Sequence, residues 1–154
     1  MEIVKLHLDP QFLDDKKTAV LYQQIQTLLK LIEQKQIPVK TVEIINRKIM
    51  DINFMSFQHA NVYKPLKQMQ TDMIKLLEKD HKLVPRNYYR NIWLAAGMGA
   101  FGLPIGAAFG LLIGNIALLS IGLPIGMAIG VGLGTSLDKK AAAEGRQLDI
   151  EIRH

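Results

Sequence analysis

Side chains that commonly perform chemistry are few in this chain and are scattered along it. There are four histidines, His7, His59, His81 and His154, and no cysteine. No two histidines stand at the HxxxH or HExxH spacing that turns two imidazoles toward one metal. Without cysteine, neither a disulfide nor a thiolate metal site can form. We therefore interpret the histidines as surface or packing residues, and we predict a non-enzymatic protein without metal or cofactor.

Two further patterns resemble functional motifs without their chemistry. Asp14 and Asp15 are adjacent, but they precede a predicted helix and are expected to cap its N-terminus. The GxxxG runs lack the Lys-Ser/Thr pair of a phosphate-binding loop. No aromatic platform accompanies the lysines, so sequence-specific nucleic-acid binding is not indicated, although an anionic signal stays open as a ligand.

The elements that would carry any site follow from the charge distribution. Residues 91–137 contain no Asp, Glu, Lys, Arg or His, and the net charge of +5 lies in residues 1–90. About 20 apolar residues cross a bilayer as a helix. The segment therefore predicts two transmembrane helices, 92–113 and 116–136, joined at Gly114-Asn115. A buried hairpin of a soluble protein is the alternative, but neither helix has a polar face and little chain remains to cover both.

The predicted membrane hairpin divides the chain into three parts and fixes its orientation. A cytosolic helical domain would span 1–90, the hairpin 91–137 and a cytosolic tail 138–154. Basic residues flank only the two outer ends of the hairpin, which predicts that both termini lie in the cytosol. Those expected to contact anionic lipid are Lys82, Arg86, Arg90, Lys139 and Lys140.

Glycine is concentrated in the apolar segment: all twelve glycines except Gly145 lie there. Two ladders repeat every four residues, and their members are Gly102, Gly106, Gly110 and Gly114, and then Gly122, Gly126, Gly130 and Gly134. Small residues at this spacing let helix backbones touch in lipid. A second small stripe includes Ala100, Ala108, Ala128 and Gly132 on the opposite faces. The glycine ladders can close the hairpin within one chain, while the second small stripe packs against neighbouring chains. We therefore predict a homo-oligomer.

Pro104 and Pro124 occupy matching places in a twenty-residue internal repeat, and folding back at the turn would bring them to the same depth. Each removes a helical hydrogen bond, which frees the carbonyl oxygens of Ala100 and Ser120. Freed groups at membrane depth must be satisfied by protein, water or an ion. A paired kink is the favoured interpretation, and a gate or ion contact is the alternative.

The two ladders, followed by Asp138-Lys139-Lys140, resemble the glycine-zipper family of small bacterial membrane proteins over about residues 97–145. The resemblance implies a zippered segment in a bacterial inner membrane, and in some such proteins pores or oligomers. It supplies no catalytic residue.

Apolar residues at three-four spacing predict amphipathic helices in residues 14–82. The predicted core stripes are Leu21, Ile25, Leu28, Leu29 and Ile32, then Val42, Ile45, Ile49 and Ile52, then Leu66, Met69, Met73 and Leu76. At the two ends, residues 4–8 and 148–152 alternate between apolar and polar side chains. This alternation predicts two short strands that could pair with each other.

The predicted fold is therefore an all-α membrane protein, with a cytosolic bundle, a two-helix hairpin and short terminal strands. Two functions stay open. The first, which is slightly favoured, is an oligomeric pore or channel, a defence-type effector gated by the cytosolic domain. The second is a non-conducting anchor or scaffold that recruits a cytosolic protein. The scarcity of polar residues for a pore lining weighs against the pore. The second small stripe slightly favours assembly, which does not require conduction.

Overall fold

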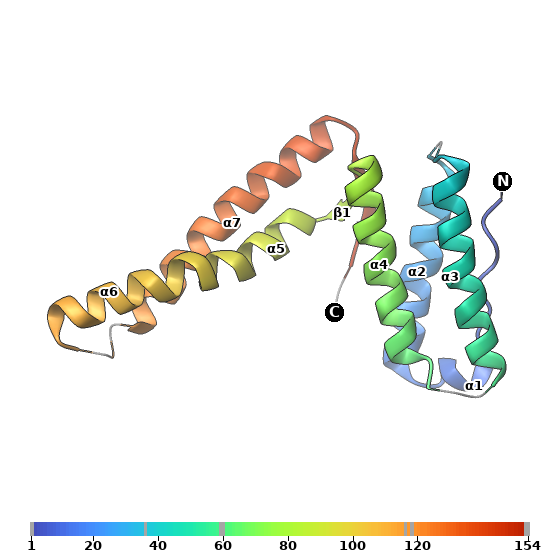
Figure 1. Ribbon diagram of the computed structural model, residues 1–154, viewed down its shortest axis with the longest axis horizontal. Coiled ribbons are helices and arrows are strands. Elements are labelled where there is room, and N and C mark those ends of the chain that lie inside the picture. The colour runs from blue at the N-terminus through green and yellow to red at the C-terminus, as the bar shows by residue number, and fades with distance from the viewer. Residues whose placement is uncertain (1, 36, 59–60, 116, 118, 153–154) are drawn as a thin grey trace. The chain divides into compact units, whose positions relative to one another are not determined.

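The computed structural model describes residues 2–35, 37–58, 61–115, 117 and 119–152 (Figure 1). The chain is mostly helical and forms two compact units. The helical unit comprises Met1–Val84 and Leu148–His154, and the hairpin unit comprises Pro85–Gln147. The predominantly helical class is confirmed, and a short two-stranded sheet is present in addition.

The helical unit contains α1 (Pro10–Leu13), α2 (Lys16–Glu33), α3 (Val39–Phe57) and α4 (Tyr63–His81). Local chemistry explains where these helices begin. The carboxylate of Asp15 caps α2, accepting hydrogen bonds from the backbone N–H of Thr18 at 3.0 Å and from its hydroxyl at 2.6 Å. Pro38 stands at the N-cap of α3, where its fixed φ suits entry into the helix. The predicted cap at Asp15 is therefore confirmed.

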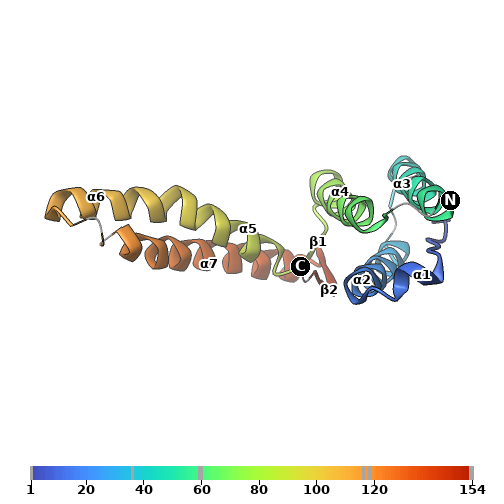
Figure 2. The same ribbon diagram turned by 90° about the horizontal axis from the view of Figure 1, so that it is seen from below.

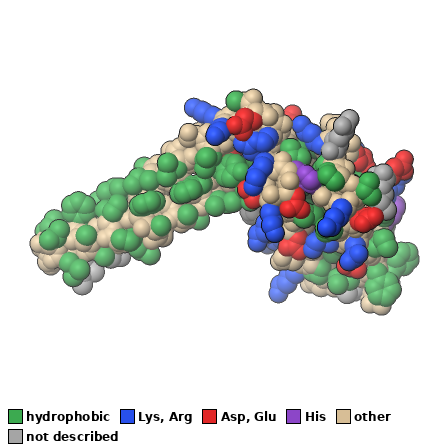
Figure 3. Space-filling view, turned by 45° about the horizontal axis from the view of Figure 1, so that its top comes forward, with side chains coloured by type: hydrophobic (Ala, Val, Ile, Leu, Met, Phe, Trp, Pro, Cys, Tyr) green, Lys and Arg blue, Asp and Glu red, His purple; other side chains and the backbone are tan. Residues whose placement is uncertain are grey.

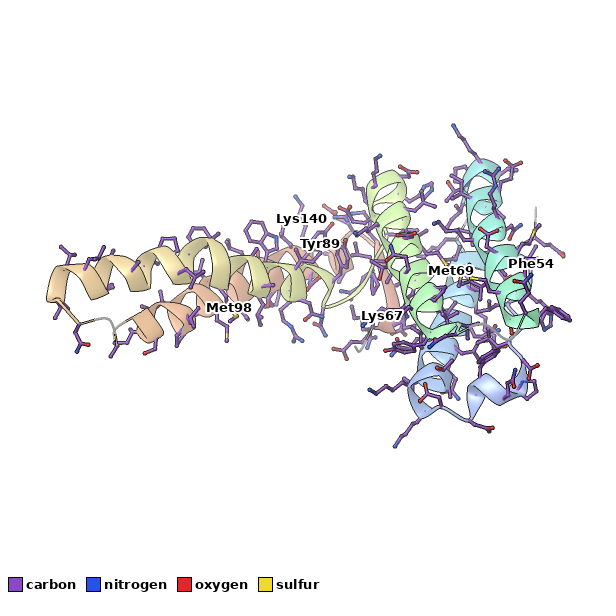
Figure 4. The ribbon with its side chains drawn as sticks, turned by 60° about the horizontal axis from the view of Figure 1, so that its bottom comes forward. Phe54, Lys67, Met69, Tyr89, Met98 and Lys140 are labelled. Atoms are coloured by element: carbon purple, nitrogen blue, oxygen red, sulfur yellow. The ribbon has the colours of Figure 1, made fainter. Side chains whose placement is uncertain are left out.

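The predicted stripes form the core of the helical unit. Its buried residues on α2, α3 and α4 include Leu21, Ile25, Leu28, Leu29, Ile32, Val42, Ile45, Ile49, Ile52, Leu66, Met69 and Met73. One prediction is wrong: Leu77 is fully buried, whereas Leu76 is only half-buried. The stripe continues from Met73 by four residues rather than three, because 3.6 residues make a turn and both steps share a face. Met69 points between the helices, and Phe54 points away from them (Figure 4).

The prediction of paired terminal strands is half right. Gln147–Glu151 is strand β2, as expected, but it pairs with β1 (Val84–Arg86). Residues 2–9 are extended without joining a sheet. Alternation alone does not choose a partner, and side chains of α2 and α3 satisfy the backbone of this segment instead. Ile152 lies beyond β2, and residues 153–154 lie outside the described residues.

The hairpin unit is built from α5 (Tyr88–Gly97), the π-helix η1 (Met98–Gly102), α6 (Leu103–Ile113) and α7 (Leu119–Ala143). The first three follow one another without a break, and α7 returns alongside them (Figure 2). Gly114 ends α6 in the left-handed conformation, with φ 71°.

Both helices of the hairpin extend beyond the predicted spans at the end away from the turn. The first begins at Tyr88 rather than Ile92, and α7 continues past Ser136 to Ala143. Charged residues end an apolar span, but they do not end a helix. The predicted start at Ile116 lies outside the described residues.

Candidate functional site

Glycine lines the inner face of α7 along its length. Gly122, Gly126, Gly130 and Gly134 are buried, and the first helix crosses directly over them. A Cβ atom on Gly126 would lie 2.6 Å from the Cα of Gly102, and one on Gly134 would lie 2.5 Å from the Cα of Arg90. Real Cβ contacts are essentially never below 3.0 Å. The two backbones therefore touch, and no side chain fits between them.

The first helix meets this ladder with Gly97, Gly102, Gly106 and Gly110, all of which are buried. The sequence-based ladder omitted Gly97, which stands five residues before Gly102. A Cβ on Gly97 would lie 2.8 Å from the Cα of Gly130. Five residues overshoot one α-helical turn, but the π-helix η1 lies between these two glycines and winds more residues into a turn. This π-helix therefore keeps both on the inner face.

Gly114 was expected to extend the same ladder, but the structure gives it another place. It is exposed, has no atom within 4 Å of a Cβ position, and adopts φ 71° at the end of α6. That conformation is one that glycine reaches without steric cost. The residue thus turns the chain at the tip of the hairpin.

The outer faces carry the second small stripe. Ala100, Ala108, Ala128 and Gly132 are all exposed, and a Cβ on Gly132 would meet nothing within 4 Å. Large apolar side chains of the same unit are also exposed, and those more than 45% exposed include Ile92, Leu103, Phe109, Leu111, Leu112, Ile113 and Ile121. Apolar side chains cover the visible face of the hairpin in Figure 3. The inner face of the hairpin is therefore lined by glycine, and its large apolar side chains lie outside beside the small stripe.

The two prolines lie at the same level of the hairpin, as predicted. Gly122 and Gly126, which flank Pro124, both face Gly102, and Gly122 also faces Gly106. Pro104 is in the first turn of α6, directly after η1, and Pro124 is inside α7. Both are exposed on the outer surface.

Ser120, the other residue of the proposed gate, bonds locally. Its hydroxyl donates to the carbonyl of Ala117 at 2.8 Å. At the same tip, the side-chain oxygen of Asn115 accepts from the N–H of Ala117 at 3.0 Å. These polar groups therefore stabilise the turn of the hairpin.

A carboxylate closes the opposite end of the hairpin, and the sequence analysis gave it no role. Asp138 is 6% exposed and accepts hydrogen bonds from the backbone N–H groups of Tyr89, at 3.0 Å, and Arg90, at 2.9 Å. These amides belong to the first turn of α5, where N–H groups lack a helical partner. A carboxylate there also faces the positive end of the helix dipole. Asp138 thus caps α5 from the neighbouring helix.

We call this interaction the Asp138 clamp, and the sequence contains a signal for it. Asp138 stands four residues after Gly134 and so continues the ladder by one step. A residue at the next inner position of α7 must meet the start of the first helix. An acceptor of the N-cap type at that place predicts the clamp.

Basic side chains of the hairpin unit gather around this closed end. Arg86, Lys139 and Lys140 are exposed, and Arg90 is half-buried. Lys140 and Tyr89 lie at the same end of the hairpin (Figure 4). Arg146 forms an ion pair with Glu144, and this hydrogen bond raises the pKa of the guanidinium above its ordinary value. Lys82 belongs to the helical unit, where it ends α4 with φ 57°.

Two helices of the hairpin, Tyr88–Ile113 and Ser120–Ala143, are long and apolar enough to cross a membrane. In the most apolar stretch of each helix, only 22% is buried. A core helix of a soluble protein would be mostly covered. Among the described residues, no group of His, Cys, Asp or Glu is arranged to hold a metal ion. The comparisons with family models, curated proteins and solved structures found no match to this chain.

Proposed function

We propose that the protein is a membrane anchor whose glycine-lined hairpin tethers the helical unit to a bilayer. The observation that carries this proposal is the inverted packing of the hairpin. Backbone fills its interior, and exposed Leu, Ile and Phe cover its exterior. Such a continuous apolar surface is rare on soluble proteins and suits contact with lipid or with another chain.

The charged end of the hairpin supports one orientation. Arg86, Arg90, Lys139 and Lys140 belong to the end that Asp138 closes, and the turn at Gly114 has no charge. Positive residues remain on the cytoplasmic side, so both termini would lie in the cytosol of a bacterium and the turn would face outward. The basic side chains would contact anionic lipid headgroups.

The anchor is further proposed to associate with copies of itself. The inner glycines are used within the hairpin, whereas Ala100, Ala108, Ala128 and Gly132 remain exposed. Exposed small residues let a second helix approach closely in lipid, where the hydrophobic effect gives little drive for association. The helical unit would then be displayed in several copies, as a platform for a cytosolic partner.

An ion-conducting pore is the second candidate. The small outer stripes and the paired Pro104 and Pro124 favour it, because copies could assemble around an axis with freed carbonyls at one depth. The polar side chains available to line it are few, and Ser120 already bonds to its own turn. Any path would be mostly apolar and gated by dewetting. The anchor therefore fits the geometry better.

Single-cysteine labelling tests the anchor and its orientation together, because the natural chain has no cysteine. A membrane-impermeant maleimide added outside spheroplasts should label Asn115→Cys, and it should label Lys139→Cys only after permeabilisation. The protein should also remain in the membrane pellet after extraction with carbonate. Release into the soluble fraction would reject the anchor.

Ion flux separates the two candidates. Liposomes containing the purified protein should show no flux above that of empty liposomes if the hairpin only anchors. Flux that disappears in the Gly106→Leu, Gly126→Leu double variant, with unchanged incorporation, would instead establish the pore. Crosslinking of the protein in detergent tests self-association independently of both.

A further inference from the structure

Residues 2–9 lie extended against α2 and α3, and α3 holds their main chain with side-chain amides. Asn46 accepts a hydrogen bond from the N–H of Val4 at 2.8 Å and donates one to the carbonyl of Glu2 at 3.0 Å. This pair of bonds is the one that a neighbouring β-strand would make. Asn46 is itself buried.

The same arrangement repeats two turns further along α3. Asn53 accepts from the N–H of His7 at 2.8 Å and donates to the carbonyl of Lys5 at 3.0 Å. Ser56 then accepts from the N–H of Asp9 at 2.8 Å. These residues of α3 follow one helix face and together act as a substitute for a strand.

The opposite wall, α2, makes the remaining contacts. The Tyr22 hydroxyl and the Gln26 amide both donate to the carbonyl of Leu6, each at 3.1 Å. Leu6 is also 1% exposed and belongs to the core. We call the region between Tyr22 and Gln26 of α2 and Asn46, Asn53 and Ser56 of α3 the strand groove.

The strand groove therefore recognises an extended main chain and one apolar side chain. All seven hydrogen bonds described above end on backbone atoms of residues 2–9, and none uses a side chain of that segment. Recognition of this kind resembles β-strand addition, in which main-chain bonds give affinity and a pocket gives specificity.

The segment has the features of an occupant that can leave. A hollow of about 260 Å³ adjoins it along α2, and one of about 440 Å³ adjoins it where α2 ends and the chain connects to α3, so the fit around it is incomplete. The next element, α1, contains no buried residue. It contacts α2 and is followed by the bend at Asp14-Asp15, which leads into that helix. Opening this bend would move residues 2–9 with little loss of packing outside the strand groove itself.

We propose that the strand groove takes residues 2–9 of a second copy of this chain, so that neighbouring copies exchange these segments. The occupant is one that already fits, because the same seven bonds and the same Leu6 contact form in either arrangement. Exchange of an identical element is a low-cost route to association. The proposal rests on the self-association proposed above, and it adds to the hairpin contact a second contact between the helical units.

Crosslinking between differently tagged full-length copies tests the exchange. One copy carries Lys5→Cys and the other carries Met50→Cys. Both positions are exposed, and Met50 lies on α3 between Asn46 and Asn53. The copies are co-expressed, purified together in detergent and treated with a short bis-maleimide. A covalent dimer bearing both tags is the expected product, since no other thiol is present.

Matched variants make the result decisive. In the control, the second copy carries Lys75→Cys of α4 in place of Met50→Cys. This pair should give no mixed dimer. Adding Leu6→Asp to the Lys5→Cys copy should lower the yield by more than about tenfold, because the position of Leu6 is buried and an unpaired carboxylate is strongly unfavourable there. Circular dichroism checks that each variant is folded. A third variant carries both cysteines in one chain. If the crosslink forms only within that chain, and separate copies give no mixed dimer, the proposed exchange is wrong. Association through the hairpin would not be affected by that result.

Discussion

The helical unit and the hairpin unit both bury one residue in every three or four along their helices, but they bury opposite kinds of residue. In the helical unit, Ile25 and Ile45 are fully buried and charged side chains face outward. In the hairpin unit, Gly126 and Gly130 are buried while Leu111 and Leu112 are more than 80% exposed. Water drives large apolar side chains together, whereas lipid gives them no reason to leave the surface. The contrast is the one expected if the helical unit lies in water and the hairpin lies in lipid, as proposed.

Enlarging a buried residue should have the largest effect in the hairpin. Gly126→Leu places a side chain where even a Cβ would overlap the backbone of Gly102. Overpacking costs about 1–3 kcal/mol in ordinary cores and more where backbone must move, so we expect separation of the two helices. Loss of a crosslink between cysteines at Leu94 and Val131 would measure it. Gly132→Leu, on the open outer face, is the control and should keep the crosslink.

Truncating a buried side chain should lower stability most in the helical unit. Ile45→Ala removes a fully buried side chain from α3 and is expected to cost about 2–5 kcal/mol of unfolding free energy. Chemical denaturation followed by circular dichroism measures this cost. Phe57→Ala, at a residue that is 83% exposed, should be nearly neutral. Equal losses for both variants would contradict the assigned core.

The Asp138 clamp offers a smaller effect at the charged end of the hairpin. Asp138→Ala leaves the N–H groups of Tyr89 and Arg90 without their acceptor, which should cost about 1–3 kcal/mol. Hydrogen exchange at these two amides should accelerate while exchange near Gly106 stays slow. Lys139→Ala, at the next residue of the same helix, is the control and should leave the exchange rates at both places unchanged. Unchanged exchange at Tyr89 and Arg90 in Asp138→Ala would contradict the clamp.

Acid should have the smallest effect, and it should act on the helical unit. Hydrogen bonds from Thr18 hold the pKa of Asp15 below the ordinary 3.8. The hydrogen bond from Lys48 likewise lowers the pKa of Asp72. Both carboxyls bind protons more weakly when folded, so their stabilisation is complete above about pH 4 and is lost as pH falls through the folded pKa values. Melting temperatures should therefore decline below pH 4, and the decline should be shallower in Asp15→Asn.

Several features followed from residue types alone. The turn glycine Gly114, the cap Asp15 and the core stripe from Leu21 to Ile32 depend on interactions within a few residues. The same is true of the four-residue glycine ladder of α7, since 3.6 residues per turn fix its face. These predictions are confirmed because each signal and its consequence lie on the same element.

Other features depended on which elements meet. Alternation in residues 4–8 indicated a strand, yet amides of Asn46 and Asn53 took the place of a partner strand. Gly97 joined the ladder only through the extra residue wound into η1. Asp138 gained its role when α7 crossed the start of α5.

The sequence by itself thus determined the helices, their buried stripes and the charge-free segment, because periodicity and charge are local properties of a chain. Only the tertiary structure decided the partner of β2, the inclusion of Gly97 and the cap on α5. Each of these depends on elements that are far apart in the sequence, and each involves a backbone group, which carries no residue-specific signal that could announce its partner. The spacing of Asp138 from Gly134 marks its helix face, but only the fold brings the amides of Tyr89 and Arg90 to its carboxylate.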